Sequence, residues 1–290
     1  MKPPAFEYSR PVTVEETLGL LRQHGADAKV LAGGQSLVPL MNFRLAQPAH
    51  LIDVNALDEL DYVRDEDGAL RIGALTRQAT VEDSTLVENR CPLLADATRL
   101  IGHRTVRNRG TVGGNVAHAD PTGEYPTLLV ALDGQVVARS SSGERVIPAA
   151  ELFHTIFTTT LDADELLTEV RVPVLPDGTG WAYEELSLRH GDYAQVGVAA
   201  TVRLDAAGRF EEVRLALAAV GEIPLRCRDA EATLTGRAAD DAAIAEAGAA
   251  CAAVAQPQDD MHASATYKTA MVEVFVRRAL RRAMDQVRRA

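Results

Sequence analysis

Apolar and polar residues at the start of the chain repeat first with the period of a helix and then with that of a strand. Thr13 and Glu16 have the spacing of a capping box ahead of apolar residues at positions 14, 18 and 21, which predicts an amphipathic helix that Gly25 ends. "AKVLAGG" then predicts a short buried strand and a glycine turn, and "HLIDVN" predicts another strand over residues 51–55. This order indicates a small α/β unit.

From about residue 57 the pattern changes to hairpins around a helix. "LDYVRDEDGALRIGAL" predicts a hairpin that turns at Asp67-Gly68, and "GQVVARSSSGERVIP" predicts one that turns at Ser142-Gly143. "ELLTEVRVPV" predicts a further strand that ends at Pro173. The apolar residues on one face of the predicted helix are Leu93, Leu94, Ala97, Leu100 and Ile101.

The stretch "VLPDGTG", residues 174–180, has the composition of a linker. After it, "WAYEELSLR", "VGVAATVRL" and "EVRLALAAVG" predict three long strands, and helical patterns follow over 240–255 and about 265–289. We therefore predict an α+β protein with a domain boundary near residue 176. The first domain, 1–176, would contain two α/β subdomains, at about 1–56 and 57–176. The second, 177–290, would combine a three-stranded antiparallel sheet with a helix bundle.

Composition and charge narrow the classes of function. The 290 residues are 47% hydrophobic, and 30 basic against 41 acidic side chains give a formal net charge of −11. Nucleic acid binding is therefore not expected, because it depends on basic residues that neutralise phosphates. No apolar run approaches the roughly 20 residues that span a bilayer. The first residues, "MKPPAFEYSRP", contain no apolar segment of a secretory signal, so we expect a cytoplasmic protein.

The spacing of cysteine and histidine indicates no metal site. Cys91, Cys227 and Cys251 are odd in number and far apart, so we expect neither a disulfide framework nor a zinc site nor an iron–sulfur cluster in this chain. The histidines match no metal-ligand spacing. Aromatic residues make up only 4% of the chain, which makes a large substrate pocket lined by aromatic rings hard to assemble.

Two glycine pairs form the candidate ligand-binding segments. "LAGGQSL", residues 31–37, follows a predicted strand, and "TVGGN", residues 111–115, lies within "RNRGTVGGNVAHADPTGEYP". Because glycine has no Cβ atom, such backbone can turn tightly, expose consecutive N–H groups and approach a ligand closely. Ser36, Thr111 and Asn115 add short polar side chains that can reach phosphate oxygens.

One such turn alone is more typical of an ordinary loop, whereas two together favour a cradle for phosphates. Arg107 and Arg109 add positive charge beside the second pair. Neither segment has the six-position glycine fingerprint of dinucleotide folds or the lysine–serine ending of a P-loop. A dinucleotide such as FAD, whose pyrophosphate needs several N–H donors, would suit this pair of segments.

These segments also carry a family resemblance. "AKVLAGGQSLVPLMNFRL", "VRNRGTVGGN" followed by "AHADP", and "RHGDYA" together resemble the FAD-binding medium subunits of the molybdenum hydroxylases. That family includes carbon monoxide dehydrogenase, nicotine dehydrogenase, quinoline 2-oxidoreductase and, as a domain of a longer chain, xanthine dehydrogenase. The resemblance covers nearly the whole chain. It implies a PCMH-type FAD-binding domain followed by a C-terminal domain like that of the carbon monoxide dehydrogenase flavoprotein.

The resemblance further implies which residues contact FAD. Segments 29–37 and 111–115 would cradle the pyrophosphate, Glu124 would contact the cofactor, and Leu167 would lie near the flavin ring. Tyr193, in "GDYA", matches an aromatic position that lies against the flavin; without the resemblance it would be interpreted as an ordinary strand residue. The implied cofactor-binding residues are Lys29, Val30, Leu31, Ala32, Gly33, Gly34, Gln35, Ser36, Leu37, Thr111, Val112, Gly113, Gly114, Asn115, Glu124, Leu167 and Tyr193.

The sequence departs from the family pattern at one position. Xanthine dehydrogenase has a lysine that contacts FAD shortly before the segment that corresponds to "RHGDYA", and Glu184 stands at the matching position here. The role of that lysine is therefore not transferred to this chain.

As a function, the resemblance implies the electron-transfer subunit of an oxidoreductase. A large subunit would hold the molybdenum cofactor, and a small subunit would hold two [2Fe–2S] clusters. This chain would pass electrons from those clusters through FAD to an external acceptor, within a dimer of heterotrimers. The chain's lack of cluster cysteines and of an evident substrate constellation agrees with this division.

Several alternatives stay open at the level of sequence. The chain could instead be a self-sufficient FAD-dependent oxidoreductase of the same flavin-binding superfamily, or a non-enzymatic scaffold whose glycine pairs are only turns. His118 and Asp120 could act as an acid–base pair, but we favour loop hydrogen bonding in which Asp120 caps the next helix. The last helix is rich in arginine, which favours a solvated face over a docking surface for an acidic partner. Its arginines are Arg277, Arg278, Arg281, Arg282, Arg288 and Arg289.

Overall fold

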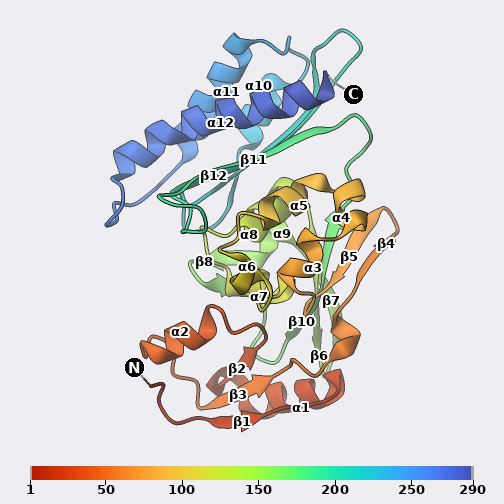
Figure 1. Ribbon diagram of the computed structural model, residues 1–290, viewed down its shortest axis with the longest axis vertical. Coiled ribbons are helices and arrows are strands. Elements are labelled where there is room, and N and C mark those ends of the chain that lie inside the picture. The colour runs from red at the N-terminus through yellow and green to blue at the C-terminus, as the bar shows by residue number, and fades with distance from the viewer. Residues whose placement is uncertain (1, 289–290) are drawn as a thin grey trace.

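The chain is built in three layers stacked along its long axis (Figure 1). The computed structural model describes residues 2–288, so Arg289 of the predicted last helix lies outside the described residues. The N-terminal unit is at one end, a larger antiparallel sheet with its helices is in the middle, and a second antiparallel sheet covered by helices is at the other end. The α+β class predicted from the sequence is confirmed.

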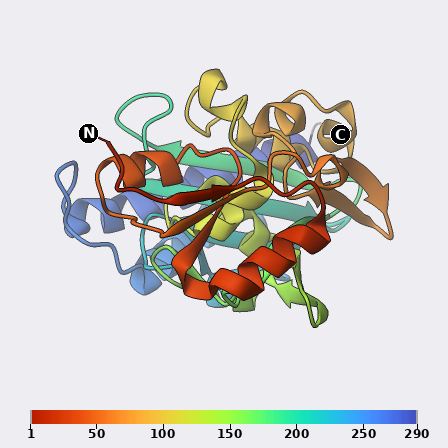
Figure 2. The ribbon, with the colours of Figure 1, turned by 90° about the horizontal axis from the view of Figure 1, so that it is seen from below.

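The N-terminal unit is a three-stranded parallel sheet with the strand order β1-β3-β2. Seen from its end, α1 lies beside the strands with the other layers behind (Figure 2). Thr13 caps α1 by accepting the Glu16 N–H, and Gly25 ends it at a φ of 50°, as the capping pattern predicts. The short β1 and α2 had no pattern long enough to predict them. The elements are β1 (Glu7–Ser9), α1 (Val14–His24), η1 (Gly25–Asp27), β2 (Ala28–Leu31), α2 (Leu37–Asn42) and β3 (His50–Asp53).

The middle layer is an antiparallel sheet with the order β4-β5-β10-β6-β7. Both predicted hairpins are present, with Glu66 paired to Ala69 across the first turn and Ser140 paired to Gly143 across the second. The first turns at Asp67-Gly68 as predicted, but the second turns at residues 141–142, one residue earlier than predicted, because Gly143 already pairs in β7. The strands are β4 (Val63–Glu66), β5 (Ala69–Gly73), β6 (Gln135–Ser140), β7 (Gly143–Pro148) and β10 (Leu166–Pro173), with a small separate hairpin of β8 (Phe153–Thr155) and β9 (Thr158–Thr159).

Short helices cover this sheet. The predicted helix through Leu93 ends earlier than expected, because the chain tightens into i→i−3 hydrogen bonds after Thr98, so Leu100 and Ile101 follow the helix instead of belonging to it. The helices are η2 (Asp58–Leu60), α3 (Gln78–Glu82), α4 (Thr85–Arg90), α5 (Pro92–Thr98), α6 (Arg104–Arg107), α7 (Val112–His118), α8 (Glu124–Ala131) and α9 (Ala149–Leu152).

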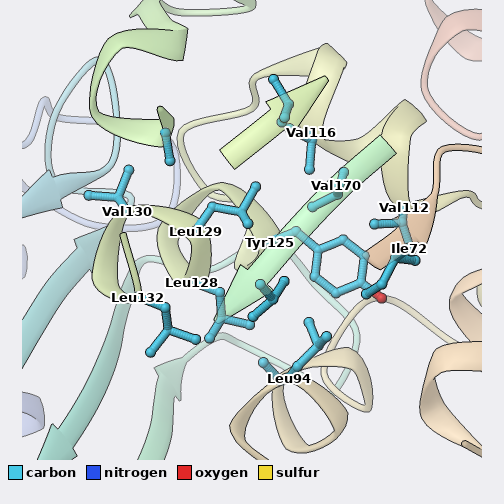
Figure 3. Close-up of a cluster of buried hydrophobic side chains, with 14 of the residues drawn as sticks. Ile72, Leu94, Val112, Val116, Tyr125, Leu128, Leu129, Val130, Leu132 and Val170 are labelled. Atoms are coloured by element: carbon cyan, nitrogen blue, oxygen red, sulfur yellow. The ribbon is translucent and has the colours of Figure 1, made fainter. Parts of the chain in front are cut away.

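The core of the middle layer is packed around α8 and β10 (Figure 3). Tyr125 inserts its ring between Ile72 and Leu94, and only 1% of it is exposed. Its hydroxyl lies 3.0 Å from the Thr98 hydroxyl, so the buried polar atom keeps a hydrogen-bond partner. The α7 and α8 helices are thereby fixed against the sheet on which the candidate site is built.

The C-terminal layer is an antiparallel sheet with α12 lying across it (Figure 1). The three long predicted strands are present, but a two-residue strand, β14, pairs with β13 and makes the sheet four-stranded, which corrects the expected three. The elements are β11 (Gly180–Leu186), β12 (Val196–Leu204), β13 (Phe210–Ala218), β14 (Leu225–Arg226), α10 (Arg228–Leu234), α11 (Asp241–Val254) and α12 (Ala265–Val287).

The arginines of α12 are not simply a solvated face. Arg281 pairs with Asp241 at 2.8 Å, and Arg282 pairs with both Asp96 at 2.9 Å and Glu184 at 3.1 Å. Asp96 belongs to α5 of the middle layer, so Arg282 ties the C-terminal helix to that layer. The solvated-face interpretation is therefore wrong for Arg282, because tertiary packing brings carboxylates to it that the sequence pattern does not show.

Gly180 lets α12 lie directly on β11. A Cβ atom at Gly180 would lie 2.7 Å from Cγ2 of Val287 and 2.8 Å from the carbonyl carbon of Ala283.

We expect Gly180→Ala to lower the free energy of unfolding by about 2 kcal/mol or more, because helix and strand would be forced apart. Gly19→Ala, in α1 with open space around the glycine, is the matched control and should raise it by about 0.5–1 kcal/mol. Urea unfolding measures both; an unchanged Gly180→Ala protein would contradict this packing.

Candidate functional site

The two glycine segments lie against each other. A Cβ atom on Gly33 would come within 2.8 Å of the Gly110 Cα and would overlap the Arg109 carbonyl oxygen. On the other side, a Cβ atom on Gly114 would lie 3.7 Å from the Ala32 Cβ. The fold therefore brings residues 32–34 and 109–114 together, although almost eighty residues separate them in the sequence.

The first segment offers unused N–H groups. Lys29, Val30 and Leu31 belong to β2 and pair with β3, but within the described residues the N–H groups of 32–36 donate no hydrogen bond to the chain. Gly34 has a φ of 72°, which a glycine adopts without strain, and this turns the chain between β2 and α2. Consecutive unbonded N–H groups in a turn form a concave site of positive potential that suits an anion.

The second segment is built differently. Four of its five backbone donors are already used: the N–H groups of Val112 and Gly113 bond to the carbonyls of Thr76 and Ala74, that of Gly114 bonds to the Thr111 hydroxyl at 3.1 Å, and that of Asn115 bonds to the Thr111 carbonyl. Thr111 is thus the N-cap of α7. The expectation that this segment exposes consecutive N–H groups is wrong, since the helix cap and the neighbouring strand end take them.

The second segment offers a ligand mainly its polar side chains and the backbone of its two glycines, which have no Cβ atom. Asn115 is partly buried, and its Oδ1 has no hydrogen-bond partner among the described residues. The Thr111 hydroxyl accepts from Gly114 and keeps its own proton for donation. An unpaired buried amide oxygen is costly unless a partner is supplied, so Asn115 is poised for a ligand or for water.

Two residues outside both segments connect them. Asn55, just after β3, donates from Nδ2 to the Ala32 carbonyl at 2.8 Å, and Arg77, just before α3, donates to Asn55 Oδ1 at 2.8 Å and to the Arg109 carbonyl at 2.6 Å. Sequence reasoning missed both. Neither residue lies in a glycine turn, and a polar residue at the end of an apolar strand was the only available hint for Asn55.

Two partly buried glutamates and a buried tyrosine lie where α8 meets the C-terminal sheet. Burial, with the charge of Glu185 next in size, raises the pKa of Glu124 to about 8. Burial also raises the pKa of Glu185, in β11, to about 7. Tyr183 is only 1% exposed, and its hydroxyl and Glu185 Oε2 have no partner in the described chain. Near neutral pH Glu124 therefore carries a proton and can donate a hydrogen bond. Glu185 and Tyr183 were not anticipated from the sequence.

His118 and Asp120 belong to a constrained loop. Asp120 does not cap α8, as had been favoured; its carboxylate accepts from the Thr122 N–H at 2.9 Å and hydroxyl at 2.7 Å, and Gly123 is the N-cap. The Asp120 carboxylate closes the turn over residues 120–122, so it is not available to the first N–H groups of α8. The ring of His118 stacks on Phe157 at 4.9 Å, and burial lowers its pKa.

The backbone around this loop is strained. Ala119, Phe157 and Ala219 all have φ values between 53° and 64°. They meet here, since the Phe157 N–H bonds to the Ala119 carbonyl and the Ala219 N–H bonds to the Pro121 carbonyl. Such conformations cost energy in residues other than glycine, and they concentrate at functional sites.

The remaining site residues are placed in different ways. Tyr193 lies in the loop between β11 and β12, not in a strand, and it is 76% exposed. Leu167 is 6% exposed within the core around β10, so its predicted contact with a flavin would involve little of its side chain. Glu184 pairs with Arg282 and thus has a structural partner.

Other kinds of site are not formed by the described residues. In residues 2–288 no group of three or more His, Cys, Asp or Glu side chains could hold a metal ion. Cys91, Cys227 and Cys251 are buried and free. None of the helices within residues 2–288 is long and apolar enough to cross a membrane.

Comparison with known proteins identifies the family. Residues 4–175 match the family described as FAD binding domain in molybdopterin dehydrogenase, and residues 181–283 match the family described as CO dehydrogenase flavoprotein C-terminal domain. Together these matches cover most of the chain, so the chain belongs to this family of flavoprotein subunits of molybdenum-containing dehydrogenases.

Individual relatives agree along the whole length. The chain is 42% identical over 288 residues to the 6-hydroxypseudooxynicotine dehydrogenase complex subunit alpha of Paenarthrobacter nicotinovorans, covering 99% of this chain and 97% of the relative. It is also 42% identical over 280 residues to the carbon monoxide dehydrogenase medium chain of Hydrogenophaga pseudoflava, covering 97% of each.

The fold is shared with solved structures. Carbon monoxide dehydrogenase from Hydrogenophaga pseudoflava, in a form that lacks the Mo-pyranopterin moiety, superimposes with a TM-score of 0.96 at 43% identity and covers 99% of both chains. The resemblance stated from the sequence is confirmed, and FAD is the cofactor of the family.

Glu124 should make stability depend on pH. Its folded-state pKa of about 8 lies above the ordinary value of 4.5, so the protonated form stabilises the fold at low pH, and that stabilisation is lost as pH rises from about 4.5 through about 8. Without FAD, Glu124→Gln should therefore be more stable than the wild type at pH 8.5, by on the order of 1–3 kcal/mol, and similar to it near pH 4.5.

Urea unfolding across this pH range measures the effect, with Glu144→Gln, an exposed side chain of β7, as the control. Parallel pH profiles for the wild type and Glu124→Gln would show that Glu124 is not held protonated.

Proposed function

We propose that this chain binds FAD between its two glycine segments and serves as the electron-transfer subunit of a molybdenum-containing hydroxylase or dehydrogenase. One observation carries the proposal: residues 32–36, whose N–H groups donate no hydrogen bond within the described residues, belong to a segment that touches residues 109–114 in a chain of this family. Such a row of donors suits the oxygens of a pyrophosphate.

The chain's own residues fit the cofactor in distinct roles. The backbone of 32–36 would donate to phosphate oxygens, while the Thr111 hydroxyl and the Nδ2 of Asn115 would add side-chain donors from the second segment, and the unpaired Oδ1 of Asn115 would need a donor on the ligand or a water. Glu124, protonated near neutral pH, would donate a hydrogen bond without placing a negative charge beside the cofactor. FAD supplies the redox chemistry when bound, and the protein's part is to hold and orient it.

The remaining predicted contacts belong to the same proposal. Lys29, Val30 and Leu31 lead into the first segment and Leu37 leaves it, while Val112 and Gly113 form the first turn of α7. Tyr193 lies close enough to Asp120 and Glu124 for their charges to act on it. We propose that the exposed ring of Tyr193, from the C-terminal domain, lies against the flavin. We also propose that Leu167 lies near the flavin ring.

Partner subunits follow from the relatives. One relative is named as a subunit of a dehydrogenase complex and another as a medium chain, so we propose that this chain assembles with a large subunit holding the molybdenum cofactor and a small subunit holding two [2Fe–2S] clusters. We further propose a dimer of heterotrimers, an external electron acceptor and a cytoplasmic location. The three buried free cysteines support that location.

The domain boundary is part of the proposal as well. We place it near residue 176, with an FAD-binding domain over 1–176, its subdomains at about 1–56 and 57–176, and the C-terminal domain over 177–290. Its support is that the two family matches end at 175 and begin at 181, and that most buried residues of the C-terminal sheet and helices form a hydrophobic cluster of their own.

Binding of FAD by the purified chain is the direct test. We expect a yellow protein with a dissociation constant in the micromolar range or below, measured by quenching of flavin fluorescence. Gly114→Val should reduce affinity at least about tenfold, since a branched side chain would press on the Thr111 hydroxyl and the Ala32 Cβ, which lie 2.6 and 3.7 Å from the position of an added Cβ.

Gly19→Val is the matched control, because Gly19 is also a helical glycine but has nothing within 4 Å. If Gly114→Val does not fold, Asn115→Asp tests the same segment by placing a carboxylate where an amide would meet phosphate, and it should also bind FAD at least about tenfold more weakly. A wild-type chain that takes up no FAD would contradict the proposed function.

Purification of the native complex tests the assembly. We expect two further chains, molybdenum, and a visible spectrum that combines flavin and iron–sulfur bands. If instead the isolated chain with FAD alone oxidised a small molecule at a useful rate, the chain would be a self-sufficient oxidoreductase, and the subunit proposal would fail.

A further inference from the structure

The side chain of Asn55 supports the first glycine segment through hydrogen bonds to its backbone carbonyls. Its Nδ2 donates to the Ala32 carbonyl at 2.8 Å and lies within 2.7 Å of Asp53 Oδ1 and 3.4 Å of the Leu31 carbonyl. All three neighbours of this nitrogen are acceptors, and the neighbour of Oδ1 is a guanidinium. The orientation of the amide is therefore fixed by its partners, since a flipped amide would face acceptors with its oxygen.

Arg77 joins this amide to the second segment. One terminal nitrogen of its guanidinium donates to Asn55 Oδ1 at 2.8 Å, and the other donates to the Arg109 carbonyl at 2.6 Å. The same carbonyl is the group that a Cβ atom on Gly33 would overlap. The guanidinium thus spans the point at which the two segments touch.

The backbone beside Arg77 is fixed to the second segment as well. The Gln78 N–H bonds to the Gly110 carbonyl, and the Val112 N–H bonds to the Thr76 carbonyl, so residues 76–78 run antiparallel to 110–112. The backbone of Arg77 is therefore paired with the second segment, and its side chain reaches Asn55, which supports the first segment. Burial and the nearby charge of Arg109 both lower its pKa, so the fold holds a partly desolvated cation at this point.

We propose that Arg77 is a positioning residue for the cofactor: through Asn55 and the Arg109 carbonyl it holds the N–H groups of 32–36 beside the second segment in the arrangement that binds phosphate. This inference rests on the proposed function. A loop that is ordered before binding loses less conformational entropy when the ligand arrives, which strengthens affinity without any new contact to the ligand.

Arg77→Lys tests the bridge. A lysine has a single ammonium nitrogen, which cannot span Asn55 Oδ1 and the Arg109 carbonyl as the two guanidinium nitrogens do. We expect the dissociation constant for FAD of the full-length chain to rise at least about tenfold. Arg22→Lys, an exposed arginine of α1, is the matched control and should bind FAD as tightly as the wild type.

Asn55→Asp tests the next link, and it also serves if Arg77→Lys does not fold. A carboxylate keeps the acceptor for Arg77 but faces the Ala32 carbonyl with an oxygen in place of the Nδ2 donor. We expect a similar loss of affinity. In the double variant the loss should be clearly smaller than the product of the two single losses, because both variants break one bridge.

Two further measurements separate positioning from general stability. The losses of FAD affinity in the Arg77→Lys and Asn55→Asp proteins should exceed what the change in urea midpoint of the FAD-free proteins accounts for, and the visible spectrum at saturating FAD should be unchanged, because the bridge acts on the phosphate cradle. Affinity losses that simply follow losses in unfolding free energy would overturn the inference.

The outcomes also distinguish this inference from the proposed function. If the wild type binds FAD and both variants bind it equally well, the positioning role fails while the cofactor assignment stands. If the wild type binds no FAD, the proposed function fails, and this inference fails with it.

Discussion

The candidate site depends on one close approach of backbone to backbone, that of Gly33 to residues 109–110. There is no room for a Cβ atom at this contact, so only glycine lets the turn after β2 lie on the start of α7. The contact brings the segment 32–36, whose N–H groups donate no hydrogen bond within residues 2–288, to the stretch of chain that leads into Thr111 and α7. The Arg77 bridge and the proposed pyrophosphate site both require that the two segments meet.

The two segments offer different groups to a ligand, because their backbone N–H groups are bonded within the chain to different extents. In the second segment a capping hydroxyl and three carbonyls accept from the N–H groups of residues 112–115, which fixes α7 firmly and leaves few backbone donors for a ligand. The first segment follows a strand and precedes a short helix that does not use its donors. The rigid second segment thus lies against a first segment whose N–H groups are free within the described residues, and this arrangement is suited to binding an anion.

A second constraint acts where the C-terminal layer covers the middle one. Helix α8 packs on β12 and β13, and burial there keeps the Glu124 carboxyl protonated near neutral pH, with Glu185 of β11 close by. Arg282 ties α12 to Asp96 in the middle layer. Burial under the C-terminal sheet and the charge of Glu185 thus both raise the pKa of Glu124, which lies in the middle layer. Two-domain construction of this kind lets one domain hold a ligand while the other tunes the groups around it.

Much of this was determined by the sequence alone. Capping residues, hairpin turns and long periodic strands act over a few neighbours, so α1, both hairpins and the three long strands were predicted, with ends that differ from the structure by up to three residues. The family resemblance was likewise legible in short motifs. Only the tertiary structure decided which backbone donors are free, that Asp120 closes a turn instead of capping α8, that Arg282 reaches Asp96, and that Asn55 and Arg77 connect the segments. These depend on partners far away in the chain, whose positions are fixed only when the layers pack together.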